Sequence, residues 1–460
     1  MRVPLSSVDA AWLRMDDPTN LMVVTGVMVL DAPVSIGQVS QWLASRLARF
    51  PRFTHRVVEP PGGVGVPLWE PDPQFSVDNH LFELELPPAG DDLALQALVS
   101  RLMSQPLNPA QPLWRVYLVS RYQGGAALIV RVHHCIGDGL ALVYVMLSLA
   151  DGGPEPPPPD NNHNHGSFWD TVAESLAGGA SIAASLPAAV IKEANALLDD
   201  PERMSETAAW MGAGVGALGK LLLLPPDAAT VLKGPLGAEK RVAWSAPIPL
   251  DEFKRVGRVT GSTVNDIMTS AMTGALRRYL LGRGGVPGDL TIRGIVPVNL
   301  RPADEAHELG NQFGLVFLSL PVGTADPLDR LFEVRRRMNA IKGSPEALVA
   351  FQILKAMGLA PKPLLDVVAN LFGVKATAVV TNVAGPREPI SLMGVRLRQS
   401  MFWVPSAGRL ALGVSLLSYA GGVSMGVQAD AGLIPDPERI AEGFRDEVEA
   451  LLELERSAGR

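Results

Sequence analysis

Runs of apolar residues divide the first 150 positions into strands and helices. Residues 22–30 (MVVTGVMVL) form an unbroken apolar run of strand length, which predicts a buried strand. Residues 36–50 have helical spacing. Residues 114–120 and 126–132 alternate between apolar and polar positions and predict two paired strands. Residues 140–150 are almost entirely apolar and predict a buried helix, so this part of the chain is expected to be a mixed α+β unit.

A second mixed region begins near Arg241. Residues 263–281 predict a long helix and residues 437–454 a closing helix with an acidic start. Five further segments have strand character, the last two of them forming a hairpin: residues 291–297, 314–321, 377–383, 411–419 and 423–429.

A proline-rich segment separates the two regions. Residues 151–166 read DGGPEPPPPDNNHNHG, a composition that does not form a packed element. The stretch that follows, to about residue 233, is low in charge and mostly helical in pattern. We therefore divide the chain into an N-terminal half (1–150), a linker with a helical connection (151–235) and a C-terminal half (236–460).

The amino-acid composition excludes several kinds of function for this chain. The 460 residues are 47% apolar and 19% charged, which supports a large buried interior, and the net charge of −7 argues against a nucleic-acid partner. A single cysteine, Cys135, excludes an internal disulfide and makes a cysteine-based zinc site implausible. The N-terminus resembles no signal peptide and no run is long enough to span a bilayer, so a cytoplasmic protein is expected, with low-charge segments suited to lining a tunnel or docking on lipid.

The sharpest chemical feature is the segment His133-His134-Cys135-Ile136-Gly137-Asp138-Gly139, at the end of a predicted strand. Neighbouring side chains on an extended backbone point to opposite sides, so one histidine can face a cavity while the other packs inward. Histidine is the usual general base near neutral pH. From spacing alone, two ordinary histidines at a strand end are about equally well supported, whereas a metal site lacks a third nearby ligand.

This HHxxxDG segment resembles the signature of the chloramphenicol-acetyltransferase-like acyltransferases. Other segments resemble, in order, motifs of the bacterial wax ester synthase/acyl-CoA:diacylglycerol acyltransferase family. They are Pro112-Leu113-Trp114, Gly234-Pro235-Leu236-Gly237, Thr263-Val264-Asn265-Asp266, Pro297-Val298-Asn299-Leu300-Arg301, Gly310-Asn311-Gln312-Phe313-Gly314 and Thr381-Asn382-Val383-Ala384-Gly385-Pro386. The resemblance covers almost the whole chain, with departures such as Lys233, where asparagine is usual.

The resemblance implies two chloramphenicol-acetyltransferase-like α/β domains with an active-site tunnel between them. It implies His134 as the base, with His133, Asp138 and Gly139 completing the catalytic motif and Asn265 as an oxyanion donor. Pro112, Leu113, Trp114, Asp266 and Gln312 are expected to contact substrate. The implied partners are acyl-CoA, diacylglycerol or a fatty alcohol, and a membrane or lipid-droplet surface, with no cofactor and no metal.

Several roles near the motif remain open at this stage. Asp138 is most economically structural, and a buried carboxylate needs a cation, for which Arg56 and Arg301 are the candidates. Asn265 could instead be a helix N-cap. Cys135 is a rival nucleophile, although it should point away from the face that His134 uses.

Other functions are weaker interpretations of the same sequence. A catalytically silent lipid-binding protein conflicts with the intact HHxxxDG segment, and an acyltransferase acting on carrier proteins lacks a neighbouring carrier domain. Ser424 lies in a GxSxG pattern, but within a predicted hairpin rather than at a strand-to-helix turn. A GxGxxG pattern at residues 214–219 follows no strand and does not indicate a nucleotide site.

Overall fold

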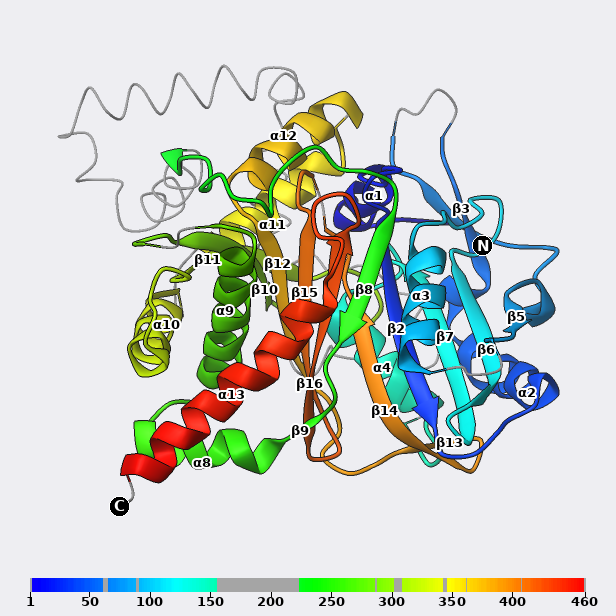
Figure 1. Ribbon diagram of the computed structural model, residues 1–460. Coiled ribbons are helices and arrows are strands. Elements are labelled where there is room, and N and C mark those ends of the chain that lie inside the picture. Colours follow the sequence, from blue (N-terminus) through cyan, green and yellow to red (C-terminus); the bar gives the residue numbers. More distant parts are fainter. Residues whose placement is uncertain are drawn as a thin grey trace, which may run out of the picture.

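The computed structural model describes residues 2–60, 65–87, 91–154, 223–285, 288–301, 308–341, 346–360, 362–406 and 408–458. Most of the predicted linker and helical connection, residues 155–222, lies outside these ranges, including His163 and His165 of the linker and the GxGxxG pattern. Within the described ranges the chain forms two large mixed sheets and a small three-stranded one, with helices packed on their faces (Figure 1).

The first large sheet has the strand order β13-β14-β2-β7-β6-β5. The predicted strand pair is confirmed, because β6 and β7 are antiparallel neighbours, and β2 lies on the other side of β7. The bounds are β2 Val23–Leu30, β5 Leu81–Leu84, β6 Trp114–Tyr122, β7 Gly125–His133, β13 Ser391–Leu392 and β14 Val395–Trp403.

Helices cover both faces of this sheet. On one face lie α1 (Ser7–Arg14), α2 (Ile36–Arg46) and α4 (Gly139–Leu149), which share a core with the small sheet of β1 (Val3–Pro4), β3 (His55–Val58) and β4 (Leu68–Pro71). On the other face lies α3 (Asp92–Met103). The helical pattern over residues 36–50 is confirmed for α2, with its last residues in a tighter 3₁₀ turn.

The second large sheet has the order β11-β10-β12-β15-β16-β8, with β9 paired to β16. The predicted hairpin is confirmed, and Ser424 lies within its second strand. The bounds are β8 Lys240–Trp244, β9 Ile248–Pro249, β10 Ile292–Asn299, β11 Phe313–Leu320, β12 Ala378–Ala384, β15 Leu412–Tyr419 and β16 Gly422–Asp430.

Two groups of helices sandwich the second sheet. α8 (Leu250–Thr260), α9 (Val264–Gly282), α10 (Pro327–Ile341) and α13 (Glu438–Ala458) build the core on one face. α11 (Glu346–Met357) and α12 (Lys362–Val374) lie on the other face, at the top of Figure 1. α11 also packs closely on α1: a Cβ at Gly358 would lie 1.6 Å from the Ser7 carbonyl oxygen.

The two halves interlock at two places that the sequence pattern did not indicate. β14 comes from the C-terminal half but pairs with β2 of the first sheet, so the segment 236–460 contributes strands to both sheets. In exchange, α3 of the N-terminal half lies against β8, where the hydroxyls of Ser100 and Ser104 accept the backbone N–H groups of Val242 and Lys240. These crossings fix the halves against each other, and the site described next lies between them.

Candidate active site

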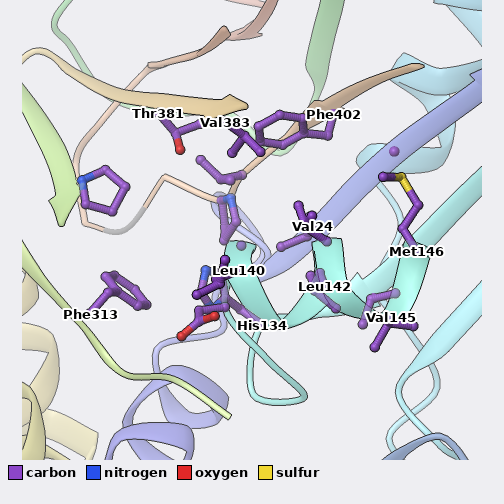
Figure 2. A pocket seen from close by; sticks show the side chains of 18 of the residues that line it. Val24, His134, Leu140, Leu142, Val145, Met146, Phe313, Thr381, Val383 and Phe402 are labelled. Atoms are coloured by element: carbon purple, nitrogen blue, oxygen red, sulfur yellow. The ribbon is translucent and has the colours of Figure 1, made fainter. Parts of the chain in front are cut away.

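A cavity of about 570 Å³ lies between the two halves, and its walls are mostly apolar. Figure 2 shows lining residues from both halves: His134, Leu140 and Leu142 from the N-terminal half, and Phe313, Thr381 and Val383 from the C-terminal half. One group of lining residues comes from α2, α4 and the first sheet, and another from α11, α12 and the second sheet. A space of this size and character can hold the chains of a lipid substrate.

His134 lies where these two groups of residues meet. It follows β7, and its ring stacks on Trp12 of α1 with the ring centroids 4.3 Å apart and the planes at 18°. Phe313 of β11 lies 5.7 Å from the same ring. Nδ1 is buried without a hydrogen-bond partner, whereas the ring is part of the cavity wall, which leaves Nε2 for the reacting group.

Burial keeps both histidines uncharged near neutral pH. It lowers the pKa of His134 below the ordinary value, and the negative charge of Asp138 opposes that shift. Burial, aided by the neighbouring His134, lowers the pKa of His133 to about 3. A neutral imidazole is the form that can accept a proton, so the electrostatics at His134 suit a general base.

The two histidines point to different sides, as the extended backbone predicts. His133 does not line the cavity: its Nδ1 accepts the Cys135 backbone N–H at 3.2 Å, and its Nε2 lies 3.8 Å from Asp16. Cys135 is fully buried in the core, also away from the cavity, and burial raises the pKa of its thiol well above the ordinary value. This environment disfavours the thiolate that a nucleophile needs.

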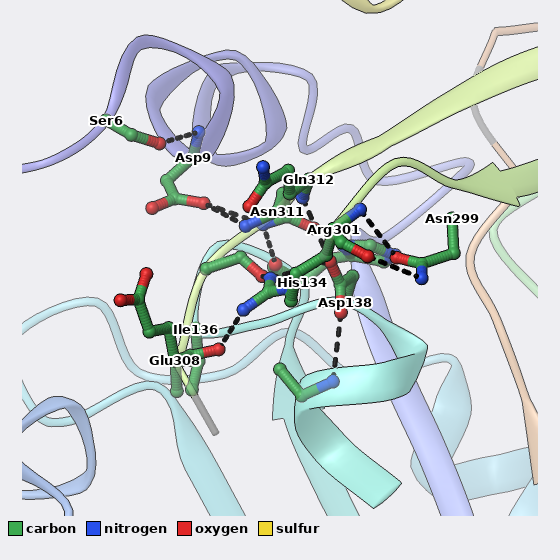
Figure 3. A network of polar contacts seen from close by, with 12 residues as sticks. Ser6, Asp9, His134, Ile136, Asp138, Asn299, Arg301, Glu308, Asn311 and Gln312 are labelled. Atoms are coloured by element: carbon green, nitrogen blue, oxygen red, sulfur yellow. Dashed lines mark hydrogen bonds and ion pairs between the residues drawn. The ribbon is translucent and has the colours of Figure 1, made fainter. Parts of the chain in front are cut away.

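Asp138 is held by partners from both halves of the chain. Its Oδ1 accepts the Ala141 backbone N–H and thereby caps α4, while its Oδ2 accepts from Arg301 at 2.9 Å and from the Gln312 backbone N–H at 2.9 Å. Of the two candidate cations, Arg301 is therefore the partner, and Arg56 pairs with Glu70 instead. No hydrogen bond joins the Asp138 carboxylate to the His134 ring, so Asp138 positions the loop (Figure 3).

The start of α4 faces the cavity. Gly139 and Leu140, the first two residues of this helix, both line it. The first N–H groups of a helix have no partner within the helix and carry partial positive charge. Asp138 occupies only the N–H of Ala141, so the amides before it are available to stabilise a negative oxygen.

Asn265 does not line the cavity with His134. The cap of α9 is Thr263, in a reciprocal capping box with Asp266, so the interpretation of Asn265 as the N-cap is wrong. The Asn265 amide oxygen instead accepts a hydrogen bond from the side chain of Asn382, which does line the cavity. Asn265 therefore holds in place the side chain of Asn382, and it is Asn382 that lines the cavity.

The residues expected to contact substrate fall into two groups. Trp114 lines the cavity, with its indole N–H bonded to the Phe53 carbonyl at 2.7 Å. Pro112, Leu113, Asp266 and Gln312 do not line it. Leu113 accepts the His133 backbone N–H, Asp266 caps α9, and Gln312 binds Asp138 through its backbone.

Sequence reasoning missed several groups around His134. Trp12 stacks on the His134 ring and Asn311 donates to the His134 carbonyl, and only Asn311 lies within a motif quoted above. Asp9 reaches this loop indirectly, through Arg52, which binds the Cys135 carbonyl. Lys233, the departure before the GPLG motif, donates to the carbonyls of Val374 and Ala376 at the end of α12. Among the described residues, no cluster of three or more histidine, cysteine or acidic side chains could hold a metal ion.

Comparisons with known proteins agree with this architecture. The model of the wax ester synthase/diacylglycerol acyltransferase catalytic domain matches residues 5–268, and the model of the WS/DGAT C-terminal domain matches residues 309–452. A Mycobacterium tuberculosis protein described as a probable diacylglycerol O-acyltransferase is 28% identical, over 98% of this chain and 96% of that protein.

Two solved structures share the fold. The wax ester synthase/diacylglycerol acyltransferase from Marinobacter aquaeolei VT8 aligns with a TM-score of 0.69 at 20% identity, covering 98% of this chain and all of that one. The first condensation domain of the calcium-dependent antibiotic synthetase aligns with a TM-score of 0.62 at 16% identity, covering 99% and 96% of the two chains.

Proposed function

The chain belongs to the wax ester synthase/diacylglycerol acyltransferase family, and we propose that it moves a long acyl chain from acyl-CoA to diacylglycerol or a fatty alcohol with His134 as the general base. The observation that carries the proposal is a neutral, stacked imidazole in the wall of a large apolar cavity. An alcohol loses its proton too reluctantly to attack unaided, and a positioned base contributes about 10²–10⁴-fold.

The proposed reaction is a direct transfer. His134 Nε2 takes the hydroxyl proton as the alcohol oxygen forms a bond to the thioester carbonyl carbon. The oxyanion that results is stabilised by the free amides at the start of α4, a contribution of roughly 3–4 kcal/mol for one good donor. The carbon–sulfur bond then breaks, and His134 returns the proton to the departing thiolate to give free CoA and an ester. No cofactor or metal takes part in this scheme.

The test of this proposal uses the purified protein with a long-chain acyl-CoA, against diacylglycerol and a fatty alcohol in parallel. Formation of triacylglycerol, wax ester or both supports it, and the ratio identifies the preferred acceptor. Release of free CoA without any ester would point to a hydrolase, and no turnover with either acceptor would favour a silent lipid-binding role.

The direct transfer predicts that Cys135→Ala keeps most of its activity, because the thiol lies buried outside the cavity with a raised pKa. Intact-mass measurement of the protein after mixing with acyl-CoA alone should show no added acyl group. A stoichiometric acyl adduct on wild type that disappears in Cys135→Ala would replace direct transfer with a two-step covalent scheme.

We further propose that the enzyme is cytoplasmic and docks peripherally on a membrane or lipid droplet through α11 and α12. No described helix is both long and apolar enough to cross a bilayer. The inner faces of both helices line the cavity, through residues such as Leu354 and Phe372, while Val367 and Leu371 of α12 are 60% and 37% exposed. A lipid surface would cover such side chains and bring apolar acceptors close to the cavity.

Replacing Val367 and Leu371 with aspartate should therefore reduce flotation with diacylglycerol-containing vesicles several-fold. Activity on a short, water-soluble alcohol should be retained, because neither side chain lines the cavity. Val259→Asp is the matched control, since Val259 is 56% exposed on the distant helix α8. Equal flotation of the double variant and the control would contradict docking through α12.

A further inference from the structure

One part of the cavity runs along helix α4, between this helix and the first sheet, and we call it the α4 arm. Its lining residues on α4 come from every turn of the helix: Gly139, Leu140, Leu142, Val143, Val145, Met146 and Leu149. Its lining residues on the sheet alternate along the strands: Val24, Gly26 and Met28 of β2, and Val130 and Val132 of β7. Figure 2 shows Val24 from the sheet and Leu142, Val145 and Met146 from the helix.

The end of the α4 arm away from His134 is held together by contacts between α2 and α4. Trp42 and Leu149 are buried and line the cavity, and the indole N–H of Trp42 donates to the Leu149 carbonyl at 2.9 Å. Arg46 donates to the carbonyls on either side, those of Ser148 and Ala150. From Gly139 to Leu149 the helix rises about 15 Å at 1.5 Å per residue. The arm is therefore long and narrow, with its open end at His134.

Gly26 is an unusual residue in the wall of this arm. It lies in the interior of β2, where a glycine weakens the strand and usually marks a bulge, a left-handed backbone or the close approach of another group. The pairing of β2 with β7 continues past Gly26 without a bulge, and its φ is not positive. The protein itself does not approach closely either, since a β-carbon at Gly26 would lie 3.6 Å from the Met401 carbonyl oxygen, an ordinary van der Waals distance.

The other glycines of the described strands all have a packing reason. Each has a heavy atom within 3.4 Å of the position that a β-carbon would take. At Gly294 the nearest atom belongs to Val380 at 3.0 Å, and at Gly314 it is the Ala347 carbonyl oxygen at 1.9 Å. Gly26 has no such neighbour and points into the cavity, so the remaining reason for a glycine is the close approach of a ligand.

We propose that the α4 arm binds the acyl chain of acyl-CoA and that Gly26 determines how long a chain it accepts. This inference rests on the proposed function, which supplies acyl-CoA as the substrate. The thioester oxygen is assigned there to the amides at the start of α4, so the chain on the same carbonyl carbon continues along α4. The acceptor then approaches from the part of the cavity that α11 and α12 line.

The position of Gly26 gives the chain length at which it acts. Gly26 pairs with Val130, four residues before His134, which is about 13 Å along extended backbone at 3.3 Å per residue. A carbon chain with single bonds of about 1.5 Å advances roughly 1.25 Å per carbon, so this distance corresponds to on the order of ten carbons. Phe402 of β14 pairs with Gly26 on the other side and also lines the cavity. Longer acyl chains must therefore cross the bare backbone of Gly26 between the side chains of Val130 and Phe402.

The experiment compares wild type, Gly26→Ala and Gly26→Val with octanoyl-CoA and palmitoyl-CoA, using one alcohol throughout. The ratio of kcat/KM for palmitoyl-CoA to that for octanoyl-CoA should fall stepwise with side-chain size. In Gly26→Val it should fall at least about 10-fold, because each methylene kept out of an apolar channel costs roughly fourfold in binding. Met28→Ala opens the arm two residues further along the same face, so it should instead shift the preference toward chains longer than palmitoyl.

Gly37→Val is the matched control. Gly37 is exposed on α2, has no atom within 4 Å of its β-carbon position and lies outside the cavity lining, so the acyl-length ratio should not change. An unchanged ratio in Gly26→Val, or an equal loss with both acyl-CoAs, would overturn the role of Gly26. A changed preference for alcohol length in place of acyl length would overturn the assignment of the arm to the acyl chain.

Calorimetric binding of the same two acyl-CoAs without any acceptor separates this inference from the proposed function. Wild type should bind palmitoyl-CoA more tightly than octanoyl-CoA, and Gly26→Val should lose that difference. If the difference survived in Gly26→Val, the α4 arm would not be the acyl site, even in an active acyltransferase. If it were lost in a protein that makes no ester, the channel would stand and the proposed function would fail.

Discussion

Replacing His134 with alanine is expected to lower kcat at least about 100-fold while the protein remains folded. The ring contributes stacking on Trp12 and a contact to Phe313, and its Nδ1 has no hydrogen-bond partner. Its removal enlarges an existing cavity rather than creating an isolated one. The loss should therefore appear in turnover far more than in stability.

The measurement is steady-state turnover with acyl-CoA and acceptor, paired with Tm on the same preparations. His133→Ala is the informative comparison, because that ring is equally buried and accepts the Cys135 backbone N–H, but lies outside the cavity. It should lose stability, with a smaller fall in kcat per folded molecule. Near-normal turnover in His134→Ala would show that another group removes the proton.

The pattern of apolar positions along the sequence was sufficient to predict the central elements of both sheets. β2, β6, β7, β15 and β16 are buried strands with strong local signals, and α9 (Val264–Gly282) matches the helix predicted over residues 263–281 to within one residue at each end. Pairing between distant strands has no such local signal. β14 joins β2 across more than 360 residues of sequence, and only the packing of the complete chain determines that partner.

The same distinction applies to the site. A side chain on a strand end has a direction that follows from the backbone, so the different environments of His133 and His134 could be predicted from sequence. The partner of Asp138 could not be chosen, because Arg56 and Arg301 lie in different parts of the chain and only the fold brings one of them close. Asn265 was misplaced for a related reason: a motif predicts which residues lie near a site, but not which of them reaches the cavity and which supports a neighbour.

The second large effect is expected at Arg301. Replacing it with methionine should lower the free energy of unfolding by about 3–5 kcal/mol, because it leaves the Asp138 carboxylate buried and unpaired. Arg301 is 6% exposed and Asp138 is 3% exposed, so water cannot replace the lost charge. The same guanidinium binds the Glu308 and Gly310 carbonyls, so the segment just before β11, residues 308–312, should loosen as well.

Urea unfolding of Arg301→Met, Arg301→Met with Asp138→Asn, and Arg336→Ala distinguishes a charge effect from a packing effect. Neutralising Asp138 removes the stranded charge, so the double variant should recover part of the loss even though it carries two substitutions. Arg336→Ala removes an exposed pair with Glu333 and should leave the unfolding curve nearly unchanged. If the double variant were instead less stable than Arg301→Met alone, the cation would be needed for its packing and carbonyl contacts rather than for the charge of Asp138. Asp138 caps α4 at the cavity, and its main-chain N–H donates to the Gly310 carbonyl. These contacts link the stability of the interface to the position of the loop that carries His134. The charge explanation therefore also requires the double variant to regain some turnover relative to Arg301→Met.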